Sequence, residues 1–158
     1  MSLDDIAPPK SQLSILLEHY QSGRYDDAEK LATSITQEFP KHQLGWKVLG
    51  IVLKQKGKLS QAVNANQTAV ELSPQDMEAL NNLGNTLNKI GRLDEAEASL
   101  RQAIMLKPDF AEAHNNLGMT LQEVGKLDEA LASYTQAIAL KPDYPNAHLN
   151  LGNTLQEV

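Results

Sequence analysis

A single spacing runs through the chain and limits what it can fold into. Prolines recur at Pro40, Pro74, Pro108 and Pro142, and glycines recur at Gly23, Gly57, Gly91 and Gly125. Each series advances by 34 residues, and an alanine follows each of these glycines by five residues. Three residue types that keep one period over four cycles indicate an internal structural repeat.

The period divides the sequence into repeats. If each repeat begins 31 residues before its proline, the repeats span 9–42, 43–76, 77–110 and 111–144. Residues 145–158 are then the first helix of an incomplete fifth repeat, and residues 1–8 form a leader. The first letters of the leader, Met-Ser-Leu, are consistent with residues added for expression, and nothing is inferred from them.

Each repeat has the pattern of two amphipathic helices. In residues 77–110, leucines and small apolar residues recur at intervals of three and four on both sides of Gly91. Glycine takes the left-handed backbone that ends a helix, so Gly91 predicts the turn between them. Pro108 ends the second helix because it lacks an amide hydrogen. Each repeat is therefore expected to be a helix, a turn, a helix and a stop.

Acidic residues follow the turn glycines. Asp94 lies three residues before Glu97, and Asp26 lies three residues before Glu29. This spacing predicts that each aspartate is the N-cap of the second helix, with the glutamate as its capping-box partner.

The segment "WKVLGIVL", followed by Ala62 and Pro74, resembles the tetratricopeptide (TPR) repeat, whose signature is Trp-x2-Leu-Gly-x2-Tyr, then alanine, then proline. Leu53 stands where the signature has tyrosine, and Asn66 stands where an aromatic residue is usual. The resemblance covers about 150 residues. The first repeat departs most, with Gln12 and Leu16 in place of the tryptophan and glycine.

The resemblance implies an all-α fold, a right-handed α-solenoid of stacked helix-turn-helix units. Four first helices contain an internal glycine, at Gly50, Gly84, Gly118 and Gly152. A glycine inside a helix costs about 1 kcal/mol relative to alanine. Close approach of a neighbouring helix is expected to offset that cost.

The resemblance also implies that the first helix of each repeat lines a concave groove. Asparagines occupy the sixth position of successive repeats, at Asn82, Asn116 and Asn150. An amide both donates and accepts, so a row of amides can hold the backbone of an extended peptide. This ladder resembles the one in the superhelical region of O-linked N-acetylglucosamine transferases. Further asparagines widen the predicted strip: Asn81, Asn85, Asn88, Asn115 and Asn153.

Two observations favour a binding role for that strip of asparagines. The segments "AHNNLGMTLQEV" and "AHLNLGNTLQEV" differ only where Asn115 and Met119 become Leu149 and Asn153, so letters in groove positions vary while the scaffold repeats. Asparagine is also a poor helix former, which solvation alone does not require. The alternative is a neutral solvated face without a ligand.

Lys47 and Lys54 are seven residues apart on the first helix of the second repeat, which places both toward the groove, near Lys56 and Lys58. They are predicted to receive acidic groups of a ligand, and the alternative is a solvated lysine face. The lysine, arginine and asparagine clamp with which some TPR proteins grip a C-terminal carboxylate has no equivalent at the corresponding positions.

The sequence predicts no catalytic, cofactor or metal site. There is no cysteine, and a net charge of −6 argues against nucleic acid and anionic membranes as partners. His114 and His148 recur at the position of Trp46 and are interpreted as packing residues. No signal peptide or membrane span is evident, so a cytoplasmic location is expected.

The last helix is expected to present an apolar edge made of Leu151, Leu155 and Val158. This edge predicts further repeats in the natural protein, or self-association.

These observations predict a non-catalytic scaffold that binds an extended peptide or protein segment. Two alternatives remain open: the substrate-recognition region of a larger enzyme, such as a glycosyltransferase, and a self-assembly module. The identity of the ligand is not encoded in a recognisable motif.

Overall fold

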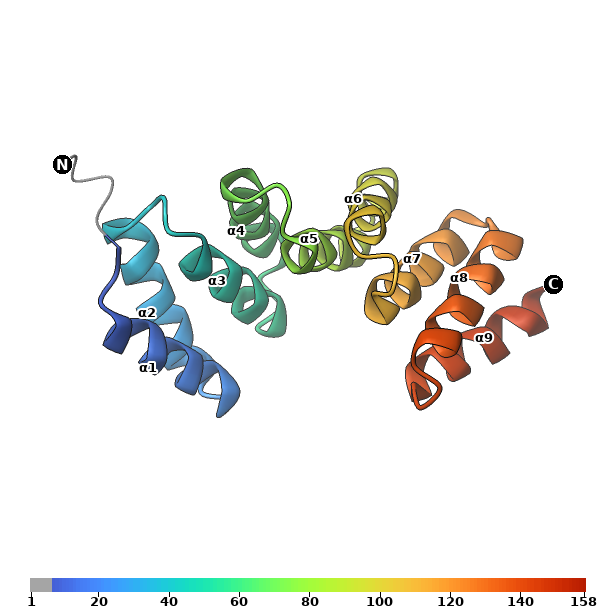
Figure 1. Ribbon diagram of the computed structural model, residues 1–158, viewed down its shortest axis with the longest axis horizontal. Helices are drawn as coiled ribbons and strands as arrows, with labels where there is room; N and C mark the ends of the chain where they lie inside the picture. The colour runs from blue at the N-terminus through green and yellow to red at the C-terminus, as the bar shows by residue number, and fades with distance from the viewer. Residues whose placement is uncertain (1–6) are drawn as a thin grey trace. The chain divides into compact units, whose positions relative to one another are not determined.

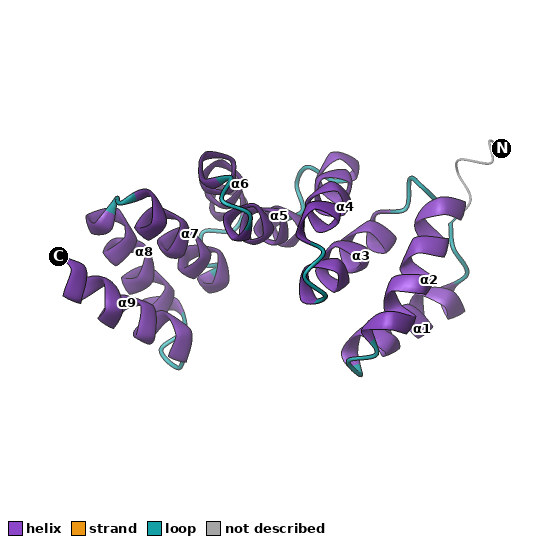
Figure 2. Cartoon of the chain, turned by 180° about the vertical axis from the view of Figure 1, so that it is seen from behind, coloured by secondary structure: helices purple, strands orange, loops and turns teal. Residues whose placement is uncertain are grey.

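The computed structural model describes residues 7–158, and over that range the chain forms nine α-helices and no β-strand. The helices are α1 (Lys10–Gln21), α2 (Tyr25–Glu38), α3 (Gln43–Gln55), α4 (Leu59–Leu72), α5 (Met77–Lys89), α6 (Leu93–Leu106), α7 (Ala111–Val124), α8 (Leu127–Leu140) and α9 (Pro145–Glu157). Short loops join them (Figure 2). The predicted all-α fold is confirmed. Residues 1–6, most of the predicted leader, lie outside the described residues.

The chain divides into two compact bodies, Met1–Pro74 and Gln75–Val158, here called the N-terminal and C-terminal bodies. Each helix packs on the next one within its body, from α1 to α4 and from α5 to α9 (Figure 1). First helices also touch, α1 with α3, α5 with α7 and α7 with α9. Each body is therefore a stack of helical hairpins, as the solenoid prediction requires.

Aliphatic residues make up most of both cores. In the N-terminal body, the buried cluster centres on Leu16, Ile35 and Val52, which come from α1, α2 and α3. In the C-terminal body, Leu100 and Tyr134 pack with residues of α7. Burial of such side chains contributes roughly 1.5–3 kcal/mol each, so the hairpins are held chiefly by their neighbours.

The predicted turn glycines adopt the expected backbone. The four of them have φ between +70° and +86°, the left-handed region that other residues avoid. At Gly91 the amide donates to the Asn88 carbonyl at 2.9 Å, and the Arg92 amide donates to Leu87 at 3.0 Å. These bonds satisfy carbonyls at the end of α5 and reverse the chain in a few residues.

The predicted N-caps are wrong. α6 begins at Leu93, so Asp94 lies inside its first turn, and α2 begins at Tyr25, so Asp26 does the same. No side chain caps either helix. The hairpin turn is shorter than the capping pattern assumes, and the acids instead complement the positive end of the helix dipole.

The ring at the fourth position of a repeat closes the loop that precedes it. Trp46 Nε1 donates to the Pro40 carbonyl at 2.8 Å. His114 and His148 repeat this contact, with Nε2 at 2.9 Å from the Pro108 and Pro142 carbonyls. Because a carbonyl only accepts, each Nε2 carries the proton. The histidines thus replace tryptophan in the same structural role.

Glycines within the first helices allow the two helices of a hairpin to approach closely. A Cβ built on Gly84 would stand 2.5 Å from Cγ of Leu100, and one built on Gly118 would stand 2.6 Å from the ring of Tyr134. Real Cβ atoms do not come that close. The contacts pair Gly50 with Asn66, Gly84 with Leu100 and Gly118 with Tyr134. The predicted close approach is confirmed at these three positions.

Gly152 has the same place in α9, but a Cβ there would meet nothing within 4 Å. We therefore expect Gly152→Ala to raise the free energy of unfolding by up to about 1 kcal/mol through helix propensity. Gly118→Ala should lower it by about 1 kcal/mol, because overpacking against the buried Tyr134 ring outweighs that gain. Urea unfolding of the two variants measures the difference. Equal effects from both substitutions would contradict the packing role of Gly118.

Candidate functional site

Asparagines on the first helices of the C-terminal body form the candidate site. Asn82 lies on α5, Asn116 on α7 and Asn150 on α9, each in the second turn of its helix. Asn82 and Asn150 are half-buried, whereas Asn116 is only 6% exposed. The predicted ladder is therefore less open at its middle rung than the sequence suggested.

The buried amides tie neighbouring first helices together. Asn116 Nδ2 donates to Asn81 Oδ1 at 2.9 Å, which joins α7 to α5. One repeat later, Asn150 Nδ2 donates to Asn115 Oδ1 at 3.2 Å, which joins α9 to α7. A sixth-position amide thus bonds the fifth-position amide of the preceding repeat. Asn81 and Asn115 are 2% and 4% exposed, so these amides lie between helices and not on an open surface.

Other polar groups extend this row of amide hydrogen bonds between first helices, here called the amide seam. Asn85 Nδ2 donates to Asn116 Oδ1 at 3.3 Å, and Asn88 Nδ2 donates to Thr120 Oγ1 at 3.3 Å. The Thr120 hydroxyl in turn donates to the Asn116 carbonyl at 3.1 Å. A buried amide without a partner would cost about 1–3 kcal/mol, so these bonds favour one alignment of α5 and α7.

Two adjoining hollows open beside these amides. The first, of about 340 Å³, is lined by residues of α5, α7 and α9 and by Tyr144: Asn85, Glu112, Asn115, Asn116, Met119, Tyr144, Asn146 and Asn150. The second, of about 410 Å³, is lined by Met119, Gln122, Glu123, Tyr134, Asn150, Asn153 and Glu157. Met119 and Asn150 border both. The hollows therefore form one continuous polar face, here called the amide face.

Several lining residues are absent from the predicted site. Glu112 and Asn146 hold the second position of their repeats, on the first helices that the resemblance assigns to the groove, so the resemblance could have identified them. Tyr144 precedes α9 as Phe110 precedes α7, one period earlier, so the repeat itself was a signal for an aromatic residue at this place. Asn82 belongs to the predicted site but lines neither hollow.

The two tyrosines of the amide face are both perturbed. The Tyr134 hydroxyl donates to Gln122 Oε1 at 3.0 Å. Burial, and then the charges of Glu123 and Glu157, raise the pKa of Tyr134 far above its ordinary value. Burial and Glu112 likewise raise the pKa of Tyr144. Both phenols therefore stay neutral and can donate hydrogen bonds at physiological pH.

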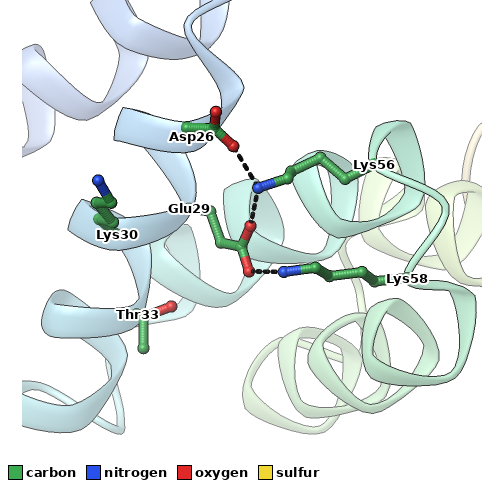
Figure 3. Close-up of a pocket in the computed structure, with 6 residues that line it drawn as sticks. All are labelled: Asp26, Glu29, Lys30, Thr33, Lys56 and Lys58. Carbon is green, nitrogen blue, oxygen red and sulfur yellow. Dashed lines mark hydrogen bonds and ion pairs between the residues drawn. The ribbon is translucent and has the colours of Figure 1, made fainter.

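The predicted lysine site lies in the other body. Lys47 and Lys54 are half-buried on α3, and each takes part in an interaction with another group. Lys56 and Lys58 turn toward α2: Lys56 Nζ lies 2.5 Å from both Asp26 and Glu29, and Lys58 Nζ lies 2.6 Å from Glu29 (Figure 3). These last two lysines are thus neutralised within the chain. As ligand contacts, Lys47 and Lys54 remain a prediction.

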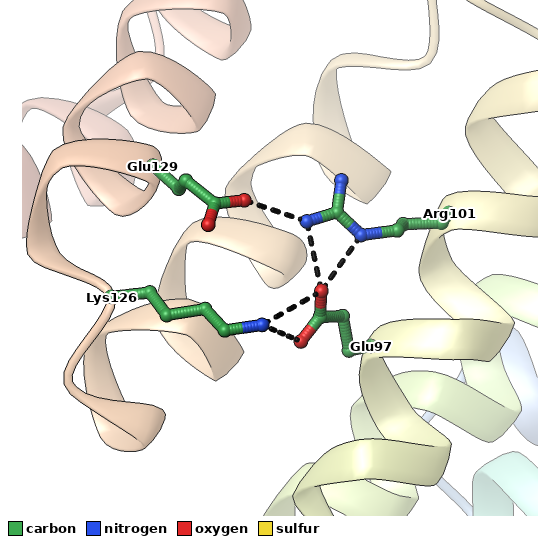
Figure 4. Close-up of polar contacts among 4 residues, drawn as sticks. All are labelled: Glu97, Arg101, Lys126 and Glu129. Atoms are coloured by element: carbon green, nitrogen blue, oxygen red, sulfur yellow. Dashed lines mark hydrogen bonds and ion pairs between the residues drawn. The ribbon is translucent and has the colours of Figure 1, made fainter.

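A second charge cluster joins α6 to α8. Glu97 lies 2.8 Å from Arg101 and 3.1 Å from Lys126, and Arg101 also reaches Glu129 at 2.8 Å (Figure 4). Glu97 and Lys126 stand two periods after Glu29 and Lys58. The glutamates predicted to complete capping boxes therefore pair with a base of the following hairpin.

The exposed apolar residues of α9 differ in part from the predicted edge. Leu155 and Val158 are 59% and 72% exposed, as expected. Leu151 is half-buried, because it packs against the core that contains Leu117 and Tyr134. Leu149, at 63% exposed, is the additional exposed leucine on this helix.

Within residues 7–158, no group of three or more His, Asp or Glu side chains is placed to hold a metal ion. No helix of this range has the length and apolar character needed to cross a membrane.

A family model described as a TPR repeat matches residues 50–91, 84–125 and 122–158. These matches cover more than half of the sequence, so the chain belongs to the TPR repeat family. The first repeat, which departs most from the signature, lies outside them. No curated protein matches the sequence.

Solved TPR structures share the fold. MamA 41-end from Desulfovibrio magneticus RS-1 is 21% identical with a TM-score of 0.83, over 94% of this chain and 84% of that one. YrrB, described as a TPR protein with an unusual peptide-binding site, is 26% identical with a TM-score of 0.78, over 86% and 70%. The first TPR of Spaghetti (RPAP3), bound to the HSP90 peptide SRMEEVD, is 21% identical with a TM-score of 0.70, over 73% and 91%.

The amide seam predicts a stability effect. Asn81→Ala should lower the free energy of unfolding by about 1–3 kcal/mol, because it leaves the buried Asn116 Nδ2 without an acceptor. Asn153→Ala, an exposed control on α9, should be neutral or slightly stabilising. Urea unfolding followed by circular dichroism measures both. An Asn81→Ala cost no larger than that of Asn153→Ala would contradict a structural role for the seam.

Glu29 predicts a pH effect. Hydrogen bonds from Lys56 and then Lys58 hold the pKa of Glu29 below its ordinary value of 4.5. A carboxyl whose folded pKa is depressed stabilises the fold above its unfolded pKa, and this contribution disappears as pH falls through the folded pKa. Glu29→Gln should therefore cost about 0.5–1 kcal/mol near neutral pH.

That cost should shrink below pH 4.5, the range in which the wild-type carboxyl becomes protonated. Urea unfolding of wild type and Glu29→Gln, from about pH 7 to about pH 3, measures the difference. Glu38→Gln, an exposed change at the end of α2, is the control. A difference that stays constant across this range would show that the ion pairs contribute nothing.

Proposed function

We propose that this chain is a non-catalytic protein-interaction scaffold that binds an extended peptide or protein segment on the amide face. The observation that carries the proposal is the pair of adjoining hollows, lined by amides from three successive first helices. Membership of the TPR repeat family supports it, as do the peptide-binding site ascribed to YrrB and the HSP90 peptide bound to the first TPR of Spaghetti. The absence of cysteine suits a reducing compartment such as the cytoplasm.

The amides divide into two groups with different tasks. Asn81, Asn115 and Asn116 are engaged in hydrogen bonds between helices, and these bonds hold α5, α7 and α9 in place. Asn146 and Asn153 are exposed, with one bordering each hollow. Their amides supply a donor and an acceptor each, which matches the alternating groups of an extended backbone. Recognition of this kind depends little on the side chains of the ligand.

Self-association is the second candidate, and the exposed leucines favour it. Leu149 and Leu155 are about three-fifths exposed on α9, so their side chains are open to a second copy of the chain. This role would place the contact on apolar side chains of α9 and not on the amides. It requires no peptide in the hollows.

The two candidates respond differently to substitution. Asn146→Ala combined with Asn153→Ala should weaken peptide capture about tenfold, because two good hydrogen bonds are lost without disturbing the seam. Gln102→Ala with Gln156→Ala, two exposed amides that line neither hollow, is the matched control. Selection from a displayed library of random peptides, followed by fluorescence anisotropy with a recovered peptide, measures the effect.

Equal affinity of the Asn146/Asn153 variant and the wild type would remove the amide face from the mechanism. If Leu155→Asp abolishes capture while both amide pairs are silent, self-association is the better account. Light scattering on the same samples distinguishes loss of assembly from loss of peptide binding.

A further inference from the structure

The net negative charge of the chain resides in its C-terminal body. Residues 75–158 carry twelve acidic and six basic side chains, whereas residues 1–74 carry eight of each. The body that presents the amide face therefore holds the whole net charge of −6. A ligand that approaches this body meets a field that attracts cations and repels anions.

Three of these acids border the hollows. Glu112 lines the first hollow, and Glu123 and Glu157 line the second. All three are exposed. Two of them accept hydrogen bonds from neutral amides: Asn81 Nδ2 donates to Glu112 Oε1 at 3.2 Å, and Gln122 Nε2 donates to Glu157 Oε1 at 2.7 Å. No residue that lines either hollow is a lysine, arginine or histidine.

These carboxylates differ from the glutamates on the second helices of the same body. Glu95 lies within ion-pair distance of an arginine. Glu97 and Glu129 likewise lie within ion-pair distance of an arginine or lysine (Figure 4). Within residues 7–158, no such pair involves Glu112, Glu123 or Glu157. Three of the carboxylates that this body leaves without an ion pair thus lie beside the hollows.

The same acids affect the two tyrosines of the amide face. Besides burial, Glu112 raises the pKa of Tyr144, and Glu123 and Glu157 raise that of Tyr134. Lys141 touches a lining residue, with its ammonium 4.9 Å from the centre of the Tyr144 ring. An ammonium over an aromatic face is a favourable contact, so this end of the amide face already accommodates a cation.

We propose that the amide face selects segments that carry lysine or arginine side chains, with the amides holding the backbone and Glu112, Glu123 and Glu157 receiving the charges. The inference rests on the proposed function, since it names the class of ligand for the same hollows. Acidic C-terminal peptides are disfavoured as ligands of this face, because no residue that lines either hollow is a lysine, arginine or histidine. The occupant is an extended basic segment of a partner protein.

Selection from the random displayed peptide library, on the full chain, tests the selectivity directly. Peptides enriched by the wild type should carry more lysine and arginine than the input library. For one such peptide, replacing its basic residues by glutamine should weaken binding about tenfold, and the difference should shrink as added salt shortens the screening length to a few ångströms.

Charge-neutral variants locate the effect. Glu112→Gln, Glu123→Gln and Glu157→Gln together keep the shape and the acceptor atoms of the side chains, and this variant should lose the preference for basic peptides. The matched control removes the same charge from exposed acids that line neither hollow, through Asp94→Asn, Asp109→Asn and Asp128→Asn. That control should keep the preference, apart from a small change common to all peptides.

The outcomes distinguish failure of the charge selectivity from failure of the proposed function. Peptides enriched without a basic bias, or a bias that survives the three glutamate substitutions, overturn the charge selectivity and leave the proposed function standing. A bias lost equally in the aspartate control also overturns it, because the net charge and not the hollows would then be responsible. Failure of the wild type to enrich any peptide overturns the proposed function and this inference together.

Discussion

The close contact between the two helices of each hairpin is the constraint on which the rest of the structure depends. Gly84 against Leu100 and Gly118 against Tyr134 bring the helices nearer than any side chain at the glycine would allow. Close contact of this kind fixes the position of the first helix within each hairpin. The amide pairs between first helices can form only when successive hairpins place these helices in the same relative position, as they do from α5 to α7 and from α7 to α9.

The amide seam adds specificity that an apolar contact would lack. Leucines facing leucines tolerate a shift along the helix axis, whereas a buried amide that loses its partner is strongly disfavoured. Asn116 meets this condition twice, as donor to Asn81 and as acceptor from Asn85. Asparagine is a poor helix former, so its place here is explained by the bonds between helices. The seam thereby fixes the geometry of the hollows beside it.

The sequence predicts what local spacing controls. The period, the helical hairpins, the left-handed glycine at Gly91 and the close approach at Gly118 follow from backbone preferences within one repeat. The bonding of Asn116 to Asn81 depends on how two hairpins are set against each other, which one repeat does not encode. A spacing of 35 residues between paired amides was the available signal, because a sixth-position asparagine follows a fifth-position one. Tyr144 had a periodic signal in Phe110, one period earlier, whereas Asp94 failed as a cap because the turn is short.

In the proposed mode of recognition, affinity and selectivity depend on different atoms of the amide face. Neutral amides such as Asn146 and Asn153 bond any extended backbone equally well, so they cannot distinguish one ligand from another. Distinction requires groups that some ligands satisfy and others leave unpaired, and Glu112, Glu123 and Glu157 are the charged groups at hand. Because the seam already orders the helices that carry them, a ligand need not order the site on binding. The same stacking that stabilises the C-terminal body therefore prepares its surface for the proposed recognition.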